Sequence, residues 1–62
     1  MTGVGAVLKK KVLKHLLTRG ESTARQIQEA TGKTRQAVLL ALAELMEAGV
    51  VEARNAGLHQ LG

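Results

Sequence analysis

The connection Gly32-Lys33-Thr34 most constrains the fold, because it joins two segments whose apolar residues recur at helical spacing. Glycine ends helices readily, since it adopts the left-handed conformation of a helix C-terminus without steric penalty. Threonine begins them, because its hydroxyl accepts a hydrogen bond from a free N–H of the first turn. Two helices joined by so few residues cannot lie antiparallel. The sequence therefore predicts that they cross at a steep angle.

The segment after this connection, residues 33–49, predicts one helix around which the rest of the chain is arranged. The helix is expected over residues 34–48 and ends at Gly49. At about 100° per residue, one apolar line predicts its core side: Val38, Leu42, Leu45 and Gly49, flanked by Ala41 and Met46. The opposite line consists of Gln36, Leu40, Ala43 and Glu47. We expect the first two turns of this helix to contact whatever partner the protein binds.

Two helical patterns precede the connection. The first begins at about residue 6 and ends at Gly20, and its broad apolar face is expected to consist of Leu8, Val12, Leu13, Leu16 and Leu17. After a short link over residues 21–23, Thr23 and Gln26 form a capping-box pattern. This pattern predicts a helix over residues 24–31 whose inward residues are Ala24, Ile27 and Ala30.

Beyond Gly49 the pattern changes from helical to strand-like. Residues 50–54 begin with two β-branched valines, residues 55–57 are turn formers, and residues 58–61 are expected to return as a second strand. The sequence thus predicts one domain over residues 1–62, mainly helical with a small β-hairpin. Two glycines within residues 1–5 disfavour a helix start, so a disordered lead-in is expected there.

The 62-residue chain contains no cysteine, proline or aromatic residue. No disulfide or thiolate metal site can stabilise so short a chain, and its core must consist of Leu, Val, Ile, Ala and Met. Such side chains bury less area per residue than aromatic ones. We therefore expect modest stability, or support from a second copy or another partner.

Positive charge is concentrated in the first half of the chain. Residues 1–35 hold eight of the nine Lys and Arg residues and two Glu, a net charge of +6, whereas residues 36–62 hold Arg54 and three Glu, a net charge of −2. This asymmetry favours an anionic partner, nucleic acid first, although a solubilising basic surface has the same composition. No apolar run approaches the about 20 residues that cross a bilayer, and no secretion signal is visible. A cytoplasmic protein without a membrane partner is expected.

Three pieces of the sequence resemble the winged helix-turn-helix family. Residues 24–38 (ARQIQEATGKTRQAV) resemble its turn unit, residues 42–52 (LAELMEAGVVE) the end of its recognition helix, and residues 12–21 (VLKHLLTRGE) its first helix. The resemblance covers residues 8–61, and the nearest groups are small MarR-like or ArsR-like regulators of prokaryotes, plasmids or phages. It implies a mainly α fold with three helices and a two- or three-stranded wing.

The resemblance also implies a transcriptional regulator that binds double-stranded DNA, as a dimer or with another protein. The third helix (34–48) would enter the major groove and the wing (54–58) would lie on the DNA backbone. The DNA-binding positions that the resemblance implies are Lys33, Thr34, Arg35, Gln36, Leu39, Leu40, Ala43, Arg25, Arg54 and Asn55. Of the groove-facing residues, only Arg35 and Gln36 can read base edges.

Relatives usually carry aromatic, basic or amide residues where this chain has Leu39, Leu40 and Ala43. Leucine can contact a thymine methyl group, but it cannot donate to guanine or phosphate. A second hypothesis is therefore a protein-interaction module that uses this apolar surface. The alternative for the two leucines is ordinary: Leu39 packs under the first helix and Leu40 is an isolated surface leucine. RNA binding is less favoured, because no aromatic residue can stack on bases.

No catalytic or metal-binding constellation is visible. The sequence has no nucleophile–base pair, and residues 3–5 lack the strand-loop-helix setting of a phosphate-binding loop. His15 and His59 have no cysteine or clustered carboxylates beside them, so ordinary packing roles are favoured. The lysines of the first helix either contact phosphate or only solubilise the surface: Lys9, Lys10, Lys11 and Lys14. We expect a protein without enzymatic activity, metal or cofactor.

Overall fold

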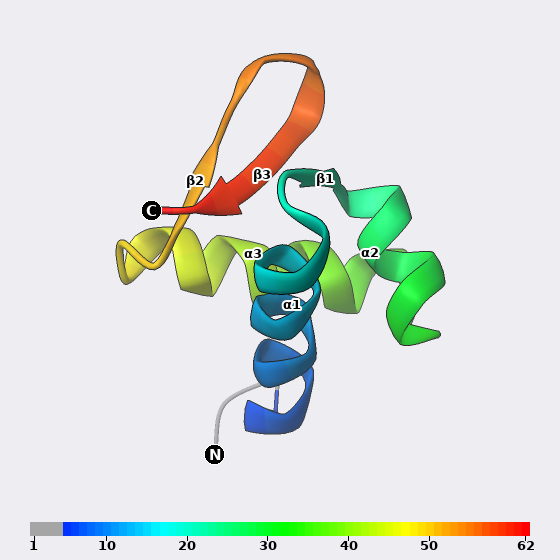
Figure 1. Cartoon of the computed structure of the whole chain (residues 1–62). Helices are drawn as coiled ribbons and strands as arrows, with labels where there is room; N and C mark the ends of the chain where they lie inside the picture. The colour runs from blue at the N-terminus through cyan, green and yellow to red at the C-terminus, as the bar shows by residue number, and fades with distance from the viewer. Residues whose placement is uncertain (1–4) are drawn as a thin grey trace.

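The computed structural model describes residues 5–62, apart from the side chain of Ala56, and shows three helices with a small antiparallel sheet (Figure 1). The helices are α1 (Ala6–Arg19), α2 (Ala24–Thr31) and α3 (Arg35–Glu47). The strands are β1 (Ser22–Thr23), β2 (Val51–Ala53) and β3 (Leu58–Leu61), and the 3₁₀ turn η1 (Asn55–Gly57) joins β2 to β3. This is a winged helix, as the resemblance implied. Of the predicted lead-in, residues 1–4 lie outside the described residues and Gly5 precedes α1.

α2 and α3 begin at the predicted caps. The Thr23 hydroxyl accepts from the Gln26 N–H at 3.1 Å, and the Gln26 side-chain oxygen accepts from the Thr23 N–H at 2.8 Å. This reciprocal pair is the capping box at the start of α2. The Thr34 hydroxyl accepts from the Ala37 N–H at 3.2 Å and starts α3 in the same way. Side chains within three residues therefore determine where both helices begin.

Glycine ends α3, also as predicted. Gly49 has a positive φ of 79°, its N–H donates to the Met46 carbonyl at 3.0 Å, and the Val50 N–H donates to the Leu45 carbonyl at 3.0 Å. These two bonds form a Schellman motif, which satisfies carbonyls that a helix end otherwise leaves free. The chain is thereby turned out of α3 towards β2.

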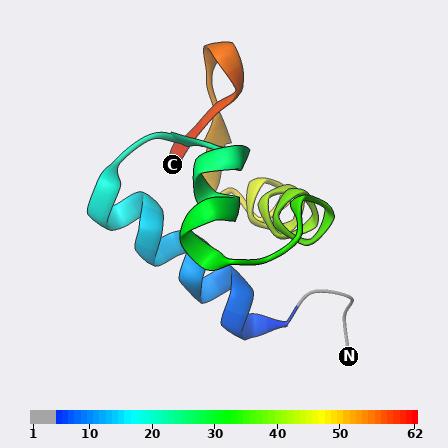
Figure 2. The same ribbon diagram turned by 90° about the vertical axis from the view of Figure 1, so that its right-hand side faces the viewer.

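The corner between α2 and α3 follows from Gly32. Its φ of 71° and ψ of 14° are left-handed, and its N–H donates to the Gln28 carbonyl at 2.9 Å. Three residues later the chain is helical again, so α3 leaves at a steep angle to α2. Figure 2 views α3 end-on with α2 beside it and shows this crossing. The steep angle predicted from the short connection is confirmed.

The core is aliphatic and draws on all three helices and on β2. Its buried side chains are Leu8, Val12, Leu16, Ile27, Val38, Ala41, Leu42, Leu45 and Val51. α3 contributes the predicted Val38, Leu42 and Leu45 with Ala41, and Met46 packs beside them. Gly49, which was placed on the same line, lies beyond the end of α3 and is exposed. The opposite line, from Gln36 to Glu47, is exposed as predicted.

Two further residues expected in the core, both on the first two helices, are exposed. Leu17 is 75% exposed, because it lies about 180° around α1 from Leu8, on a side that none of the described elements covers. Ala30 of α2 is exposed as well and lines an open groove beside α1. The buried face of α1 is therefore narrower than its leucine content suggests.

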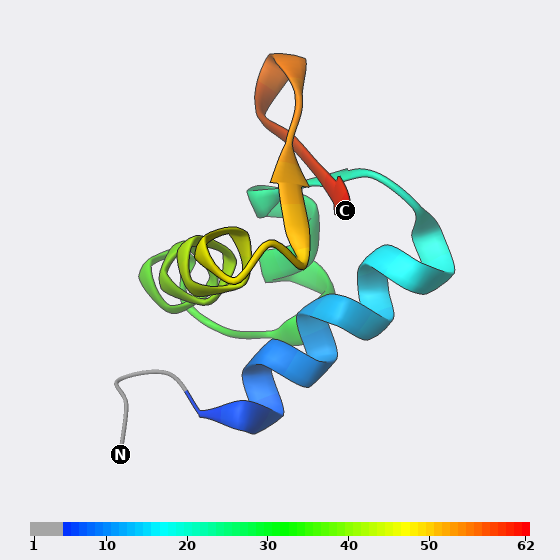
Figure 3. The same cartoon turned by 90° about the vertical axis from the view of Figure 1, so that its left-hand side faces the viewer.

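The sheet has the order β1-β3-β2, with both pairings antiparallel. Residues 22–23, which the sequence predicted as part of a link, form β1 and pair with β3: Ser22 lies opposite His59 and Thr23 opposite Leu58. The predicted strand over residues 50–54 is shorter, Val51–Ala53. Figure 3 shows β2 and β3 rising from the helical layer as the wing. Within the described residues, no helix combines the length and apolar character needed to cross a bilayer.

Candidate nucleic-acid interface

The first turns of α3 present a solvent-exposed surface that contains every predicted position of that helix. We define the open face of α3 as Arg35, Gln36, Leu39, Leu40 and Ala43, all of which are exposed. Leu39 is 41% exposed and Leu40 is 45% exposed. This exposure does not favour the alternative in which Leu39 packs under α1.

The open face consists of two side-chain rows. Residues four apart differ by about 40° around a helix, so Arg35 lies beside Leu39, and Gln36 lies beside Leu40. Ala43 follows one turn later between the two rows. Each row thus begins with a hydrogen-bonding side chain and continues with a leucine.

A groove extends the open face towards the start of α1. It has a volume of about 510 Å³ and is lined by Gly5, Val7, Leu8, Lys33, Thr34, Gln36, Ala37 and Leu40. The α1 wall is apolar, and Val7 is 67% exposed there. Val7 was not among the predicted site residues. Its place before the apolar line of α1 carries no signal, and only the crossing of α1 over α3 brings it beside Leu40.

The corner before α3 carries two of the predicted cations. Arg25 and Lys33 line a shallow groove of about 360 Å³ together with Gln28, Glu29 and Gly32. Arg25 Nε lies 3.6 Å from a Glu29 carboxylate oxygen, with side chains 82% and 70% exposed. An ion pair this exposed is weak in water, so the guanidinium can exchange its partner. Lys33 lines both grooves and connects the corner to the open face.

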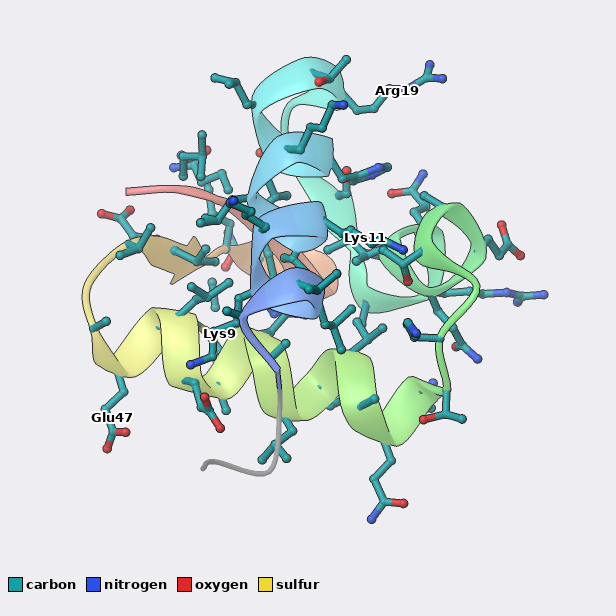
Figure 4. All side chains as sticks on the ribbon, turned by 90° about the horizontal axis from the view of Figure 1, so that it is seen from below. Lys9, Lys11, Arg19 and Glu47 are labelled. Carbon is teal, nitrogen blue, oxygen red and sulfur yellow. The ribbon has the colours of Figure 1, made fainter. Side chains whose placement is uncertain are left out.

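Charge changes sign along α3. No acidic residue lies in its first turn, whereas Glu44 and Glu47 lie in its last two turns. Glu44 forms an ion pair with Lys9 of α1 at 2.5 Å, and Glu47 extends away from α1 (Figure 4). Lys9 therefore connects α1 to α3. An anion is attracted to the beginning of α3 and repelled at its end.

Other cations of α1 lie on a different side of the molecule. Lys11, Lys14 and Arg19 line a groove of about 330 Å³ between α1 and the end of α2. Figure 4 shows Lys11 directed towards α2 and Arg19 at the far end of α1. The basic first half of the sequence therefore does not form one continuous patch.

The wing presents Arg54 and Asn55 separately from α3. Both are exposed, and the Arg54 N–H donates to the Leu58 carbonyl at 2.6 Å across the hairpin. The tip stands away from the helices in Figures 1 and 3. The structure thus divides the predicted positions into three places: the open face of α3, the corner before it, and the wing tip.

Both histidines lie where the wing joins the helices. The Ser22 hydroxyl is buried and donates to the Gly20 carbonyl at 3.1 Å, so His15 Nε2 donates to that hydroxyl at 3.0 Å. Ser22 in turn lies opposite His59 in the sheet. Neither β1 nor its pairing was predicted, and without them the contact between His15 and Ser22 has no signal in the sequence. Across residues 5–62, no three metal-binding side chains are grouped.

A helix-turn-helix corner, an exposed third helix and a wing define a class of DNA-binding proteins. A family model described as "Sugar-specific transcriptional regulator TrmB" matches residues 8–59, from the first turn of α1 into β3. The chain belongs to this family and is a DNA-binding transcriptional regulator of the helix-turn-helix type. No curated protein and no solved structure matches it.

Proposed function

We propose that the protein binds double-stranded DNA by inserting α3 into the major groove, beginning with its N-terminal turns. The open face of α3 carries this proposal: it is exposed, and the opposite line of the same helix is buried in the core. A major groove about 12 Å wide admits a helix. The acidic side chains Glu44 and Glu47 lie near the C-terminal end of α3. The N-terminal end therefore inserts more deeply into the groove.

The corner and the wing supply the phosphate contacts in this proposal. Arg25 and Lys33 flank the start of α3, where a helix in the major groove passes closest to one DNA strand. Arg54 and Asn55 at the wing tip meet the adjacent backbone. Contacts of this kind position a protein on DNA and carry no sequence information. Sequence is then read by the open face alone.

The proposal includes a single domain over residues 1–62 that acts as a homodimer in the cytoplasm. A dimer places two recognition helices about one DNA turn apart on a palindromic site. A second copy also stabilises a short chain whose core lacks aromatic side chains. The likeness of residues 24–38 to the turn unit of MarR-like and ArsR-like regulators supports this mode of binding. No enzymatic activity and no cofactor are part of it.

The test is an NMR titration of the labelled protein with short duplexes. Amide shifts are expected in residues 33–43 and at the wing tip, with affinity falling steeply as salt rises. The amides of residues 16–19, at the end of α1, provide an internal control and should not shift.

An absence of binding to every duplex at low salt would overturn the proposal. If the duplexes fail while Leu40→Glu abolishes self-association or capture by a protein partner, the interaction module is the better account. The interaction module would then rest on the exposed apolar side chains of Val7 and Leu40, which line the groove between α1 and α3.

A further inference from the structure

We infer that the open face of α3 is built to read a short block of A·T base pairs, chiefly through thymine methyl groups. This inference rests on the proposed insertion of α3 into the major groove. It concerns which bases are preferred, which neither the fold nor the family determines.

The first observation is the apolar content of the open face. Leu39, Leu40 and Ala43 are exposed side chains without hydrogen-bonding groups, on the surface that meets the base edges. In the major groove, the apolar group that a base pair presents is the thymine C5-methyl group. A methyl group packed against these side chains leaves water, and its burial is favourable. Leucines on this surface therefore favour thymine.

The second observation is Gln36, which leads the row that Leu40 continues. A glutamine amide can donate to adenine N7 and accept from adenine N6, so it recognises adenine with two bonds. Positions four apart in a helix are separated by about 6 Å along the axis, and base pairs follow each other at about 3.4 Å. Gln36 and Leu40 thus address base pairs about two steps apart, within one block.

The third observation concerns what the open face rejects. A G·C pair presents the cytosine amino group in the major groove, which is a donor and requires an acceptor. Leu39, Leu40 and Ala43 have no acceptor for this donor. An A·T pair also presents an amino group, but its thymine methyl group is buried against these side chains, whereas a G·C pair presents no methyl group that offsets the unpaired donor. Arg35 can bind guanine, but it lies about 100° around the helix from Gln36, beside the corner cations. We assign Arg35 to the edge of the block or to phosphate.

The experiment compares four duplexes with identical flanks and a different central block. The blocks are A·T, the same block with every thymine replaced by uracil, G·C, and G·C with every cytosine replaced by 5-methylcytosine. Uracil lacks only the thymine methyl group, and 5-methylcytosine adds a methyl group to the same groove without adenine. Affinities are measured at one salt concentration, by fluorescence anisotropy, for wild type, Leu39→Ala, Leu40→Ala and the control Leu17→Ala.

The wild type is expected to bind the A·T block best and to lose about fourfold in affinity for each covered methyl group in the uracil duplex. 5-Methylcytosine should improve binding to the G·C block. Leu40→Ala should reduce the ratio of thymine to uracil affinity, and alanine at this exposed helical position preserves the fold. Leu17→Ala removes an exposed leucine from α1 and should leave the ratio unchanged.

Equal affinity for the thymine and uracil duplexes would overturn the inference. So would a thymine preference that Leu40→Ala and Leu39→Ala both leave intact, because the methyl groups would then contact something else. In either case, salt-dependent binding to all four duplexes would leave the proposed function standing. A lack of binding to any of them would overturn both.

Discussion

α3 and the wing both present predicted DNA-binding residues, yet the molecule supports them differently. α3 buries four side chains along one line, begins at the Thr34 cap and ends in the Schellman motif at Gly49. In β2 of the wing only Val51 is buried, and the four residues of β3 are half-buried. The tip of the hairpin stands away from the helices (Figure 1).

This difference indicates that α3 and the wing contribute to DNA binding in different ways. A side chain that must distinguish one base from another needs a backbone held in place by packing. A side chain that neutralises phosphate tolerates a looser support, because Coulomb attraction depends weakly on direction. We therefore expect substitutions on α3 to change stability or sequence preference, and substitutions at the wing tip to change only the electrostatic part of binding.

The largest expected effect comes from breaking the support of α3. Leu42 is fully buried, so Leu42→Ala should lower the free energy of unfolding by about 3 kcal/mol through lost burial and a residual cavity. Urea denaturation followed by circular dichroism measures it. Leu58→Ala at the half-buried start of β3 is the matched change in the wing, and less than half that loss is expected. Equal losses would mean that the wing is as much a part of the core as α3.

The next largest effect is expected from Arg35→Ala, which should weaken DNA binding without changing stability. Arg35 is exposed, so the fold should be unchanged, while the loss of a charge-assisted hydrogen bond to DNA removes about 1.5 kcal/mol, or roughly tenfold in affinity. Anisotropy titration with a fixed duplex measures the change. Arg19→Ala deletes an exposed cation at the end of α1. An equal loss in that variant would show that only net charge matters.

Thr34→Ala tests the cap that positions the start of α3. Loss of the hydrogen bond to the Ala37 N–H should lower the free energy of unfolding by about 1 kcal/mol. Thr34→Ser retains a hydroxyl at this position and should remain close to wild type in the same urea titration. If Thr34→Ala and Thr34→Ser have the same free energy of unfolding, the hydroxyl does not act as the cap.

The smallest effect is expected at the wing. Arg54→Ala should weaken DNA binding a few-fold at low salt, reduce the slope of log affinity against log salt by about 0.9, and leave stability and base preference unchanged. Titrations at several salt concentrations measure the slope. A shift in the preference between thymine and uracil duplexes would show that the wing also takes part in reading sequence.

The helices and the open face of α3 were predictable because their signals are local. Thr23 and Thr34 start helices through bonds to N–H groups three residues ahead, and Gly32 and Gly49 end them through their own backbone conformation. The helical period then separates Val38 and Leu42 from Gln36 and Leu40 without knowledge of any neighbour. The wing was predicted as a hairpin for the same reason, since β-branched residues and turn formers adjoin in the sequence.

The remaining features depend on segments far apart in the chain. β1 exists only because β3 lies beside Ser22 and Thr23, and two residues carry no strand signal of their own. The exposure of Leu17 follows from how far the other elements extend along α1, and the Lys9–Glu44 pair from the crossing of α1 and α3.

The sequence by itself thus determined the helices, the corner at Gly32 and the residues of the open face, because hydrogen bonds and periodicity within a few residues specify them. Only the tertiary structure decided which of the apolar and basic residues remain accessible. It paired Lys9 with Glu44, directed Lys11 to another side, and brought Val7 to the groove beside Leu40. The physical reason is that burial depends on which distant segments pack together, and local sequence does not contain that information.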